Sequence, residues 1–249
     1  MTLPPMVTWS GGLPFPLGHD EAIHQVRGIV ANYSCGSPAY VDLVLIHWPL
    51  NYGPCSYHGP KPSIPTTDPL CDTAKPQYSE SGCRISTWKG LVAMWKGGLT
   101  RAIGVSNFNS THIQELKDAG LPLPAVNQVS WFPGIYNMTG GGDSPTTNTE
   151  TKGELLAWCK KHGVLVNGYS PFLGPNGAGK LFADPKLKAI ASAHNSTSAQ
   201  VVLNWHYQLG VATNPMAQDP AYQREDLEYF SFNLTDSEVQ VLNYFKPTL

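Results

Sequence analysis

Short apolar runs alternate along the chain with longer stretches in which apolar residues recur every three or four positions. The runs are rich in Val, Ile and Leu, as is typical of strands buried on both faces. The strongest cover residues 41–48, 101–106, 125–131 and 164–170, and weaker ones cover 5–9 and 211–215. This alternation predicts six strands in βα units, and therefore an α/β protein with a parallel sheet or barrel.

Seven amphipathic stretches between these runs predict helices. They cover residues 19–33, 87–97, 110–119, 152–162, 185–194, 198–209 and 235–245. Terminal signals support two of them: Gly163 follows the fourth, and Thr235 with Glu238 forms a capping pair at the start of the last.

Two long stretches interrupt the alternation. Residues 50–85 are rich in Pro, Gly, Tyr and Cys, which predicts a functional or partner-facing loop, and residues 137–151 are rich in Gly and Thr, which predicts a second loop. No internal repeat and no linker divides the chain, so residues 1–249 are expected to form one domain.

The strand count conflicts with a closed barrel, which requires eight strands to complete its ladder of hydrogen bonds. Either two strands escape the apolar pattern, or the front of the fold is missing. The residues before 19 are too few for two further βα units.

Composition excludes several classes of partner. The net charge is −2 and the isoelectric point is near 6.4, so neither nucleic acid nor an anionic membrane is an expected partner. No run approaches 18 apolar residues, and residues 1–12 lack the pattern of a secretory signal. The default expectation is a cytoplasmic protein, or an organellar one if a targeting peptide precedes this sequence.

The five cysteines form no CxxC pair and have no metal-type spacing with histidine, so no metal site is expected. Cys55, Cys71 and Cys83 fall within 50–85, where a disulfide is one interpretation; free thiols are favoured because a secretory signal is lacking. The same reasoning discounts the Asn-x-Ser/Thr sequons, which begin at Asn32, Asn109, Asn137, Asn195 and Asn233.

Polar side chains occur at the ends of four predicted strands, and strand ends of a barrel face a common pocket. These residues are His47, Ser106, Asn107, Gln128, Tyr169 and Ser170. Amides can pair with a carboxamide while a tyrosine ring stacks on a planar ring. Each residue alone is more typical of a structural role, but together they indicate a site for a planar ring that carries a carboxamide.

Five segments in order resemble the signature of the aldo-keto reductases. They are VDLVLIHWP (41–49), STWKGLVAMWKGGLTRAIGVSNFN (86–109), PAVNQVSWFP (124–133), ELLAWCKKHGVLVNGYSPFLG (154–174) and AQVVLNWHYQLGVATNP (199–215). The resemblance implies a TIM-type (β/α)8 barrel that reduces a small carbonyl substrate with NADP(H). It also implies that His47 orients and polarises the carbonyl, and that the cofactor contacts fall on Ser106, Asn107, Gln128, Tyr169, Ser170, Phe172 and Glu225.

The chain departs from the family's catalytic pattern. The Asp-x-Ala-x-x-Tyr-Gly-like motif, which in the family carries the proton-donating tyrosine and an aspartate, does not occur in this sequence. The closest match to the family's third-strand motif is residues 6–10, with Ser10 in place of its lysine. This alignment implies that the chain lacks about the first two βα units of the barrel, and that His47 alone remains of four catalytic groups.

The phosphate-binding end of the family's cofactor site is also altered. Aligned without gaps, the family's lysine, serine, arginine and asparagine become Met216, Ala217, Tyr222 and Asp226, whereas Glu225 is kept. Two cations opposite a phosphate contribute charge-assisted hydrogen bonds of about 1.5–3 kcal/mol each. Cofactor binding is therefore expected to be weakened or lost.

Two functions remain open. The first is a carbonyl oxidoreductase by descent that is weakly active or inactive as this chain. The alternative is a non-catalytic structural or assembly subunit that reuses the fold, with protein partners covering the open edge of the barrel.

Overall fold

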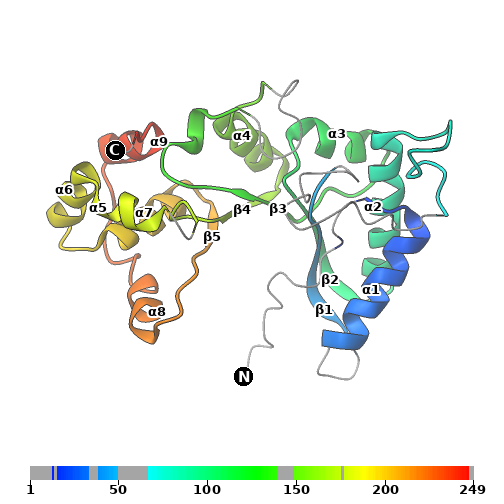
Figure 1. Cartoon of the computed structure of the whole chain (residues 1–249), viewed down its shortest axis with the longest axis horizontal. Coiled ribbons are helices and arrows are strands. Elements are labelled where there is room, and N and C mark those ends of the chain that lie inside the picture. The colour runs from blue at the N-terminus through cyan, green and yellow to red at the C-terminus, as the bar shows by residue number, and fades with distance from the viewer. Residues whose placement is uncertain are drawn as a thin grey trace. The chain divides into compact units, whose positions relative to one another are not determined.

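The computed structural model describes residues 13, 16–33, 39–49, 67–139, 149–174 and 177–246. Among these residues, those up to Asn127 form one compact unit and those from Gln128 onward form a second. Each unit is described by itself. The five strands follow the order β1-β2-β3-β4-β5 in the sheet (Figure 1).

The first unit consists of βα elements in series. It contains α1 (His19–Tyr33), β1 (Val41–Ile46), α2 (Glu80–Lys96), β2 (Thr100–Ser106), α3 (Ser110–Asp118) and the start of β3 (Val126–Ser130). β1 and β2 are parallel, in a register that runs from Val41 opposite Thr100 to Ile46 opposite Val105. The apolar run of β1 therefore lies beside that of β2, as the pattern predicted.

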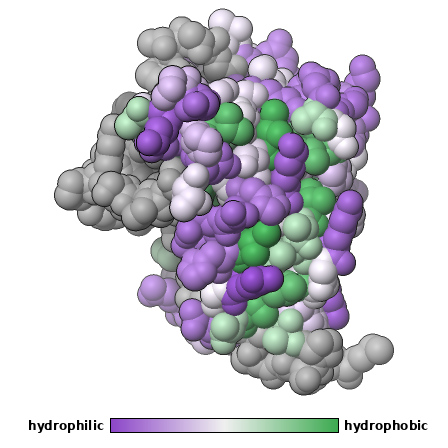
Figure 2. Space-filling view, turned by 90° about the vertical axis from the view of Figure 1, so that its right-hand side faces the viewer, coloured by the Kyte–Doolittle hydropathy of each residue, from purple (hydrophilic) through white to green (hydrophobic). Residues whose placement is uncertain are grey.

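Helices α1 and α2 pack closely because the second helix has a glycine at the contact. A Cβ at Gly90 would lie 2.6 Å from the carbonyl oxygen of His19 and 2.8 Å from the Cβ of Ala22. Trp88, two residues before Gly90, is fully buried and donates its indole N–H to the Pro122 carbonyl at 2.8 Å. Figure 2 turns this side of the molecule toward the viewer, where a broken band of hydrophobic residues lies between hydrophilic ones.

The second unit is mainly helical. It contains η2 (Ile135–Asn137), α4 (Lys152–His162), β4 (Leu165–Tyr169), α5 (Ala178–Ala183), α6 (Pro185–Ala193), α7 (Ser198–Gln208), β5 (Ala212–Asn214), α8 (Pro220–Asp226) and α9 (Asp236–Asn243). β4 and β5 are parallel from Asn167 opposite Ala212 to Tyr169 opposite Asn214. The Trp131 N–H, just after β3, donates to the Tyr169 carbonyl at 3.0 Å.

The core of the second unit contains two fully buried tryptophans, Trp131 and Trp205, whose ring centroids are 6.4 Å apart. Trp205 donates its indole N–H to the Asn243 side chain at 2.9 Å, which ties α7 to α9. His206, the next residue of α7, is also fully buried, between the carbonyls of Val202 and Trp131.

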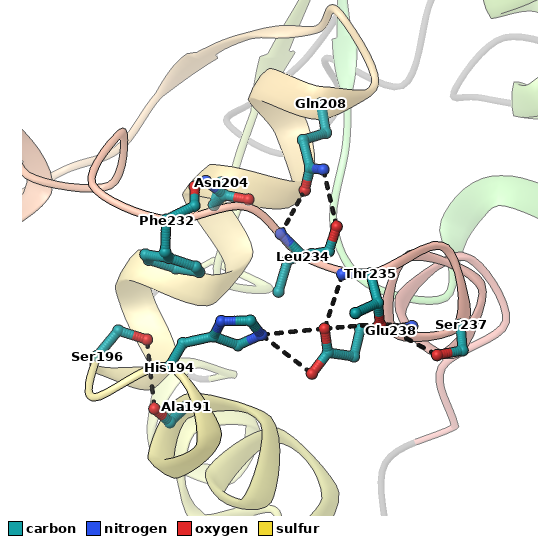
Figure 3. A network of polar contacts seen from close by, with 10 residues as sticks. All are labelled: Ala191, His194, Ser196, Asn204, Gln208, Phe232, Leu234, Thr235, Ser237 and Glu238. Atoms are coloured by element: carbon teal, nitrogen blue, oxygen red, sulfur yellow. Dashed lines mark hydrogen bonds and ion pairs between the residues drawn. The ribbon is translucent and has the colours of Figure 1, made fainter.

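Two amides of α7 bind the segment that leads to α9 (Figure 3). Asn204 donates to the carbonyls of Tyr229 and Phe232 at 2.8 and 2.7 Å. Gln208 donates to the Leu234 carbonyl and accepts from the Leu234 N–H, at 3.0 and 2.9 Å. Backbone groups that have no partner in a helix or strand are thereby satisfied.

The structure confirms most of the predicted elements. Five of the six predicted strands are present, and the sixth, at 5–9, lies outside the described residues. The seven predicted helices are present, six of them with both ends within a few residues of the prediction, and Thr235 and Glu238 form the predicted capping box of α9. Sequence analysis missed η2, α5 and α8, which are short and lie in Gly-, Pro- or Asp-containing stretches.

Two predictions about residues 50–85 were wrong. The helix predicted from 87 begins at Glu80, because Ser79 caps it by accepting from the Gly82 N–H, so residues 80–85 are helical and not part of a loop. Cys71 and Cys83 form a disulfide, which overturns the preference for free thiols at this pair. Cys159 is free and buried, and Cys35 and Cys55 lie outside the described residues.

Neither a membrane-spanning helix nor a metal cluster is found in the described ranges. No helix there is both long and apolar enough to cross a bilayer. No group of three or more His, Cys, Asp or Glu side chains is placed to hold a metal ion in that part of the chain.

Candidate functional site

His47 lies directly after β1 and is fixed by its backbone. Its N–H donates to the Leu13 carbonyl at 2.8 Å, and its carbonyl accepts from Asn107 Nδ2 at 3.0 Å. The imidazole is half-buried, and burial holds the pKa of His47 below its ordinary value of 6.5. The ring is therefore neutral at pH 7 and can donate one hydrogen bond to a carbonyl oxygen.

Asn107 brings the end of β2 to His47. It has a φ of +62°, in the left-handed region that Asn adopts more readily than most residues. Its amide nitrogen contacts both the His47 carbonyl and Ser106 Oγ, the latter at 3.1 Å. Both Ser106 and Asn107 are buried, so the first unit brings three of the predicted site residues together.

Sequence analysis missed Trp48, the neighbour of His47. The two ring centroids are 5.2 Å apart and the planes are tilted by 41°. Trp48 Nε1 is buried and has no hydrogen-bond partner within the described ranges. A buried donor without a partner is rare and is available to a ligand acceptor. The signal was its position at the end of a strand beside a candidate histidine.

Gln128 belongs to a row of three amides in the second unit. Gln128 Nε2 donates to Asn167 Oδ1 at 3.2 Å, and Asn167 Nδ2 donates to Asn214 Oδ1 at 3.2 Å. The row crosses β3, β4 and β5, and its exposure rises from the buried Gln128 to the exposed Asn214. Asn167 and Asn214 were not predicted as site residues. Each could have been noticed as a polar residue within an otherwise apolar strand.

Tyr169 and Ser170 end β4, as predicted. Both are half-buried, and Ser170 has a φ of +54°, which turns the chain sharply after the strand. Phe172 follows in this turn and packs edge-to-face on Phe182 of α5, with ring centroids 5.0 Å apart. Phe172 thus has a packing role within its own unit in addition to any contact with a cofactor.

Glu225 anchors α8 to the start of α7. Its carboxylate accepts from the Thr197 hydroxyl, and its backbone carbonyl accepts from Gln200 Nε2 at 3.2 Å. Thr197 is the N-cap of α7 and Gln200 completes the capping box. The kept glutamate therefore has a structural function that does not depend on a cofactor.

The surroundings of α8 are acidic. The Asp219 carboxylate caps the helix by accepting from the Ala221 N–H at 2.7 Å, and Arg224 is the basic residue in this helix. Burial and the charge of Glu225 raise the pKa of Asp226 above its ordinary value. A phosphate near the N-terminus of α8 would be repelled by the Asp219 carboxylate, which already accepts from the Ala221 N–H.

Two exposed side chains of this region are apolar or aromatic where cations are expected. Met216 and Tyr222, which stand where the family has cations, are 75% and 60% exposed. Neither side chain can neutralise a phosphate. The amide and hydroxyl residues at the strand ends suit a nicotinamide, whereas the residues around α8 do not suit a 2′-phosphate.

Comparison with known proteins defines the class. The parallel βα arrangement places the chain among the TIM-type α/β barrels, of which the described strands make up part. More particularly, the chain belongs to the aldo/keto reductase family, whose sequence profile matches residues 34–245. The fold class predicted from the sequence is thereby confirmed.

Relatives in this family are about 30% identical to the chain over the aligned residues. It is 30% identical over 213 residues to aldo-keto reductase family 1 member A1-A of Danio rerio, which covers 83% of this chain and 58% of that protein. It is 32% identical to aldose reductase B of Dictyostelium discoideum, over 84% of this chain and 60% of that protein. The chain therefore spans less than two thirds of the length of these relatives.

A solved structure shows the same fold. The Bombyx mori aldo-keto reductase in complex with NADP superposes with a TM-score of 0.68 at 25% identity, over 93% of this chain and 65% of that one.

Proposed function

We propose that this chain is an aldo-keto reductase that retains a nicotinamide-binding site at its strand ends and has weak or no carbonyl reductase activity. The observation that carries the proposal is the buried contact of Asn107 with Ser106 and with the carbonyl of His47. It maintains the three strand-end residues of the first unit in a defined arrangement, in which the imidazole of His47 is neutral at pH 7.

The nicotinamide end of the cofactor suits these residues. Ser106, Asn107 and Gln128 would bind its carboxamide, and Tyr169 and Ser170 would bind its ring face and the adjacent sugar. When bound, the reduced cofactor supplies a hydride to a carbonyl carbon. His47, and the unpaired Nε1 of Trp48, would donate hydrogen bonds to the carbonyl oxygen.

The proposed weak activity rests on catalytic groups of the family that the given sequence does not contain. An alkoxide formed by hydride transfer needs a proton donor, and neither the family's tyrosine motif nor its lysine is present in the sequence, where Ser10 aligns with the lysine. The neutral His47 is a poorer acid than an activated tyrosine would be at this position. A small aldehyde or ketone is the substrate class that this site would accept.

The residues around α8 favour NADH over NADPH. Met216 and Tyr222 remove the cations, and Asp219 places a carboxylate at the helix N-terminus. The NADP of the Bombyx mori structure is therefore not expected to bind this chain with equal strength. Glu225, Phe172 and Ser170 stay candidate cofactor contacts, each of which also stabilises its local structure.

The test is titration of the purified chain with NADH and NADPH, followed by tryptophan fluorescence, together with an assay on nitrobenzaldehyde. Quenching by NADH at lower concentration than by NADPH, with little or no turnover, is expected. Absence of quenching at millimolar cofactor would contradict the retained site. Rapid turnover would contradict the loss of the proton donor. Stronger binding of NADPH than of NADH would contradict the proposal that the residues around α8 disfavour a 2′-phosphate.

A structural or assembly role is the second candidate. One observation favours it: Tyr207 and Phe230 form an exposed aromatic pair in the second unit, 52% and 55% exposed. Tyr207 and Phe230 pack edge-to-face at 5.0 Å. Exposed apolar groups of this kind mark protein interfaces. Co-purification of a stoichiometric partner, lost on changing Phe230 to Ser, would support this function.

A further inference from the structure

A buried arginine lies behind the strand end that carries His47. Arg84, in α2, is only 4% exposed. Its Nε and Nη2 donate to the two carboxylate oxygens of Glu115 in α3, at 2.8 and 2.9 Å. Its Nη1 donates to the carbonyl of Pro49 at 3.2 Å. One guanidinium thus joins two helices to the turn that follows β1.

The three hydrogen bonds of Arg84 are not needed merely to fill the space between α2 and α3. Burying an ion pair costs solvation free energy, and a pair of apolar side chains can often replace it without loss of stability. Only arginine has enough N–H groups in a fixed plane to bind a carboxylate with two of them and a carbonyl with a third. The directional third bond, to Pro49, is the part that an apolar pair cannot supply.

The turn from His47 to Pro49 is held at its two carbonyls. The His47 carbonyl accepts from Asn107, and the Pro49 carbonyl accepts from Arg84. The rings of His47 and Trp48 lie between these two points, with centroids 5.2 Å apart. Each bond restrains one end of the turn, and Pro49 itself has no N–H that could add a further bond.

We propose that Arg84 is a positioning residue: its ion pair with Glu115 places the guanidinium on the Pro49 carbonyl and so fixes the turn that presents His47 and Trp48 to a carbonyl ligand. The proposal rests on the proposed function for the identity of that ligand. The positioning itself is a property of the ligand-free chain and can be measured there.

A neighbouring histidine is consistent with a permanently charged arginine. His112 of α3 is half-buried, and its desolvation together with the positive charge of Arg84 lowers the pKa of His112 to about 3. His112 therefore stays neutral and accepts from the Asn109 N–H as part of the α3 capping box. Of Glu115 and His112, only Glu115 carries a charge that balances the charge of Arg84.

The test compares three variants. Arg84→Met removes the bond to Pro49 and leaves Glu115 unpaired. Arg84→Met with Glu115→Leu replaces the pair by apolar side chains, which preserves packing but not the bond to Pro49. Arg101→Met is the matched control, because Arg101 forms an exposed ion pair with Asp42 of β1 at 3.0 Å and does not contact the turn.

The first readout is the pKa of His47, measured by NMR on the ligand-free chain. In the double variant the turn is expected to loosen and the pKa of His47 to rise toward 6.5, whereas Arg101→Met leaves it unchanged. The second readout is cofactor or carbonyl-inhibitor affinity, expected to fall about tenfold in the double variant.

The outcomes separate the two proposals. If the unchanged chain binds no nicotinamide, the proposed function fails, but the His47 titration still tests the role of Arg84. If the double variant unfolds like the unchanged chain and its His47 pKa is also the same, Arg84 has only a packing role and the inference is overturned. Should Arg84→Met alone not fold, the double variant decides the question.

Discussion

His194 Nε2 lies 3.1 and 3.0 Å from the two carboxylate oxygens of Glu238, so a single ring nitrogen contacts both oxygens (Figure 3). His194 follows α6 and Glu238 lies in the first turn of α9, so the contact joins two helices that are far apart in sequence. One of these oxygens, Glu238 Oε2, also accepts from the N–H and hydroxyl of Thr235, both at 2.8 Å.

Acid should weaken this junction. Burial acts to raise the pKa of Glu238, but the hydrogen bonds from Thr235 and His194 outweigh it, and the net pKa lies below the ordinary value of 4.5. A carboxyl with a lowered folded-state pKa stabilises the protein above its unfolded-state pKa, and this contribution is lost as the pH falls through the folded-state pKa. The change Glu238→Gln keeps the capping geometry, removes the charge and should cost about 1 kcal/mol at pH 7.

Urea unfolding of the two proteins at pH 7 and pH 3 checks this. The difference in the free energy of unfolding should shrink as the pH falls from 7 to 3, because acid protonates an increasing fraction of the native carboxyl. A difference that is the same at both pH values would show that the charge of Glu238 contributes nothing.

His206 predicts a second dependence on pH. Its ring nitrogens lie 2.8 Å from the Val202 carbonyl and 3.0 Å from the Trp131 carbonyl. Burial lowers the pKa of His206 to about 4 and outweighs these two acceptors, which favour the charged ring. Between pH 6.5 and 4 the unfolded chain binds a proton that the folded chain excludes, so stability falls with acidification, by about 3 kcal/mol in full.

NMR titration of the His206 ring, alongside urea unfolding from pH 7 to 4.5, checks this prediction. A His206 ring that titrates near 6.5 in the folded protein would rule it out.

Residue patterns predicted the elements of the fold better than the contacts between them. The strands were recognisable because β-branched runs such as 41–46 are buried on both faces, and α9 was recognisable from Thr235 and Glu238. Bonds between strands depend on register, which single-strand patterns do not contain. The contact of Asn167 with Gln128 and Asn214 was therefore missed, although each asparagine was visible as a polar residue in an apolar run.

The candidate site shows the same division. Strand-end placement was enough to identify His47, Ser106 and Asn107, and the structure brings these together. Arg84 was not identified, because a charged residue in a helix is usually exposed. Its burial depends on Glu115, which lies 31 positions away.

The disulfide gives a prediction that the sequence alone disfavoured. Cys71 and Cys83 are separated by 12 positions, and closing a loop of that length stabilises a protein by about 3 kcal/mol in the chain-entropy view. The Cys83 carbonyl accepts from the Thr87 hydroxyl, whose oxygen in turn accepts from the N–H groups of Leu17 and Gly18. The change Cys83→Ser should therefore lower the free energy of unfolding and speed hydrogen exchange at Leu17 and Gly18.

Reduction of the unchanged protein with dithiothreitol is the matched comparison, and it should reproduce both effects. If neither reduction nor Cys83→Ser alters urea unfolding, the pair does not stabilise the first unit.

Gly168 of β4 should tolerate no side chain. A Cβ there would lie 2.7 Å from the Trp131 Cβ and 3.2 Å from His206 Cδ2, both in the buried core. Gly168→Ala is expected to destabilise the chain by about 1–3 kcal/mol through overpacking. Gly179→Ala is the control: Gly179 lies in α5 with no atom within 4 Å of its added Cβ, and alanine there should stabilise the helix by up to about 1 kcal/mol. Thermal unfolding of both variants separates overpacking from a general effect of losing glycine.

The amide row predicts how Gln128 is oriented. Asn167 donates to Asn214 and so presents its oxygen to Gln128, which must then offer its NH2 group to Asn167. Asn167→Leu removes that acceptor and should weaken nicotinamide binding about tenfold, since Gln128 loses a hydrogen bond of about 1.4 kcal/mol that orients its amide.

Asn167→Asp is the matched control, because a carboxylate still accepts from Gln128 although it no longer donates to Asn214. It should retain most of the affinity for NADH that Asn167→Leu loses, with both affinities measured by fluorescence quenching. Equal affinities in the two variants would mean that Asn167 does not orient Gln128. A loss confined to Asn167→Asp would instead point to the added negative charge beside the cofactor as the dominant effect.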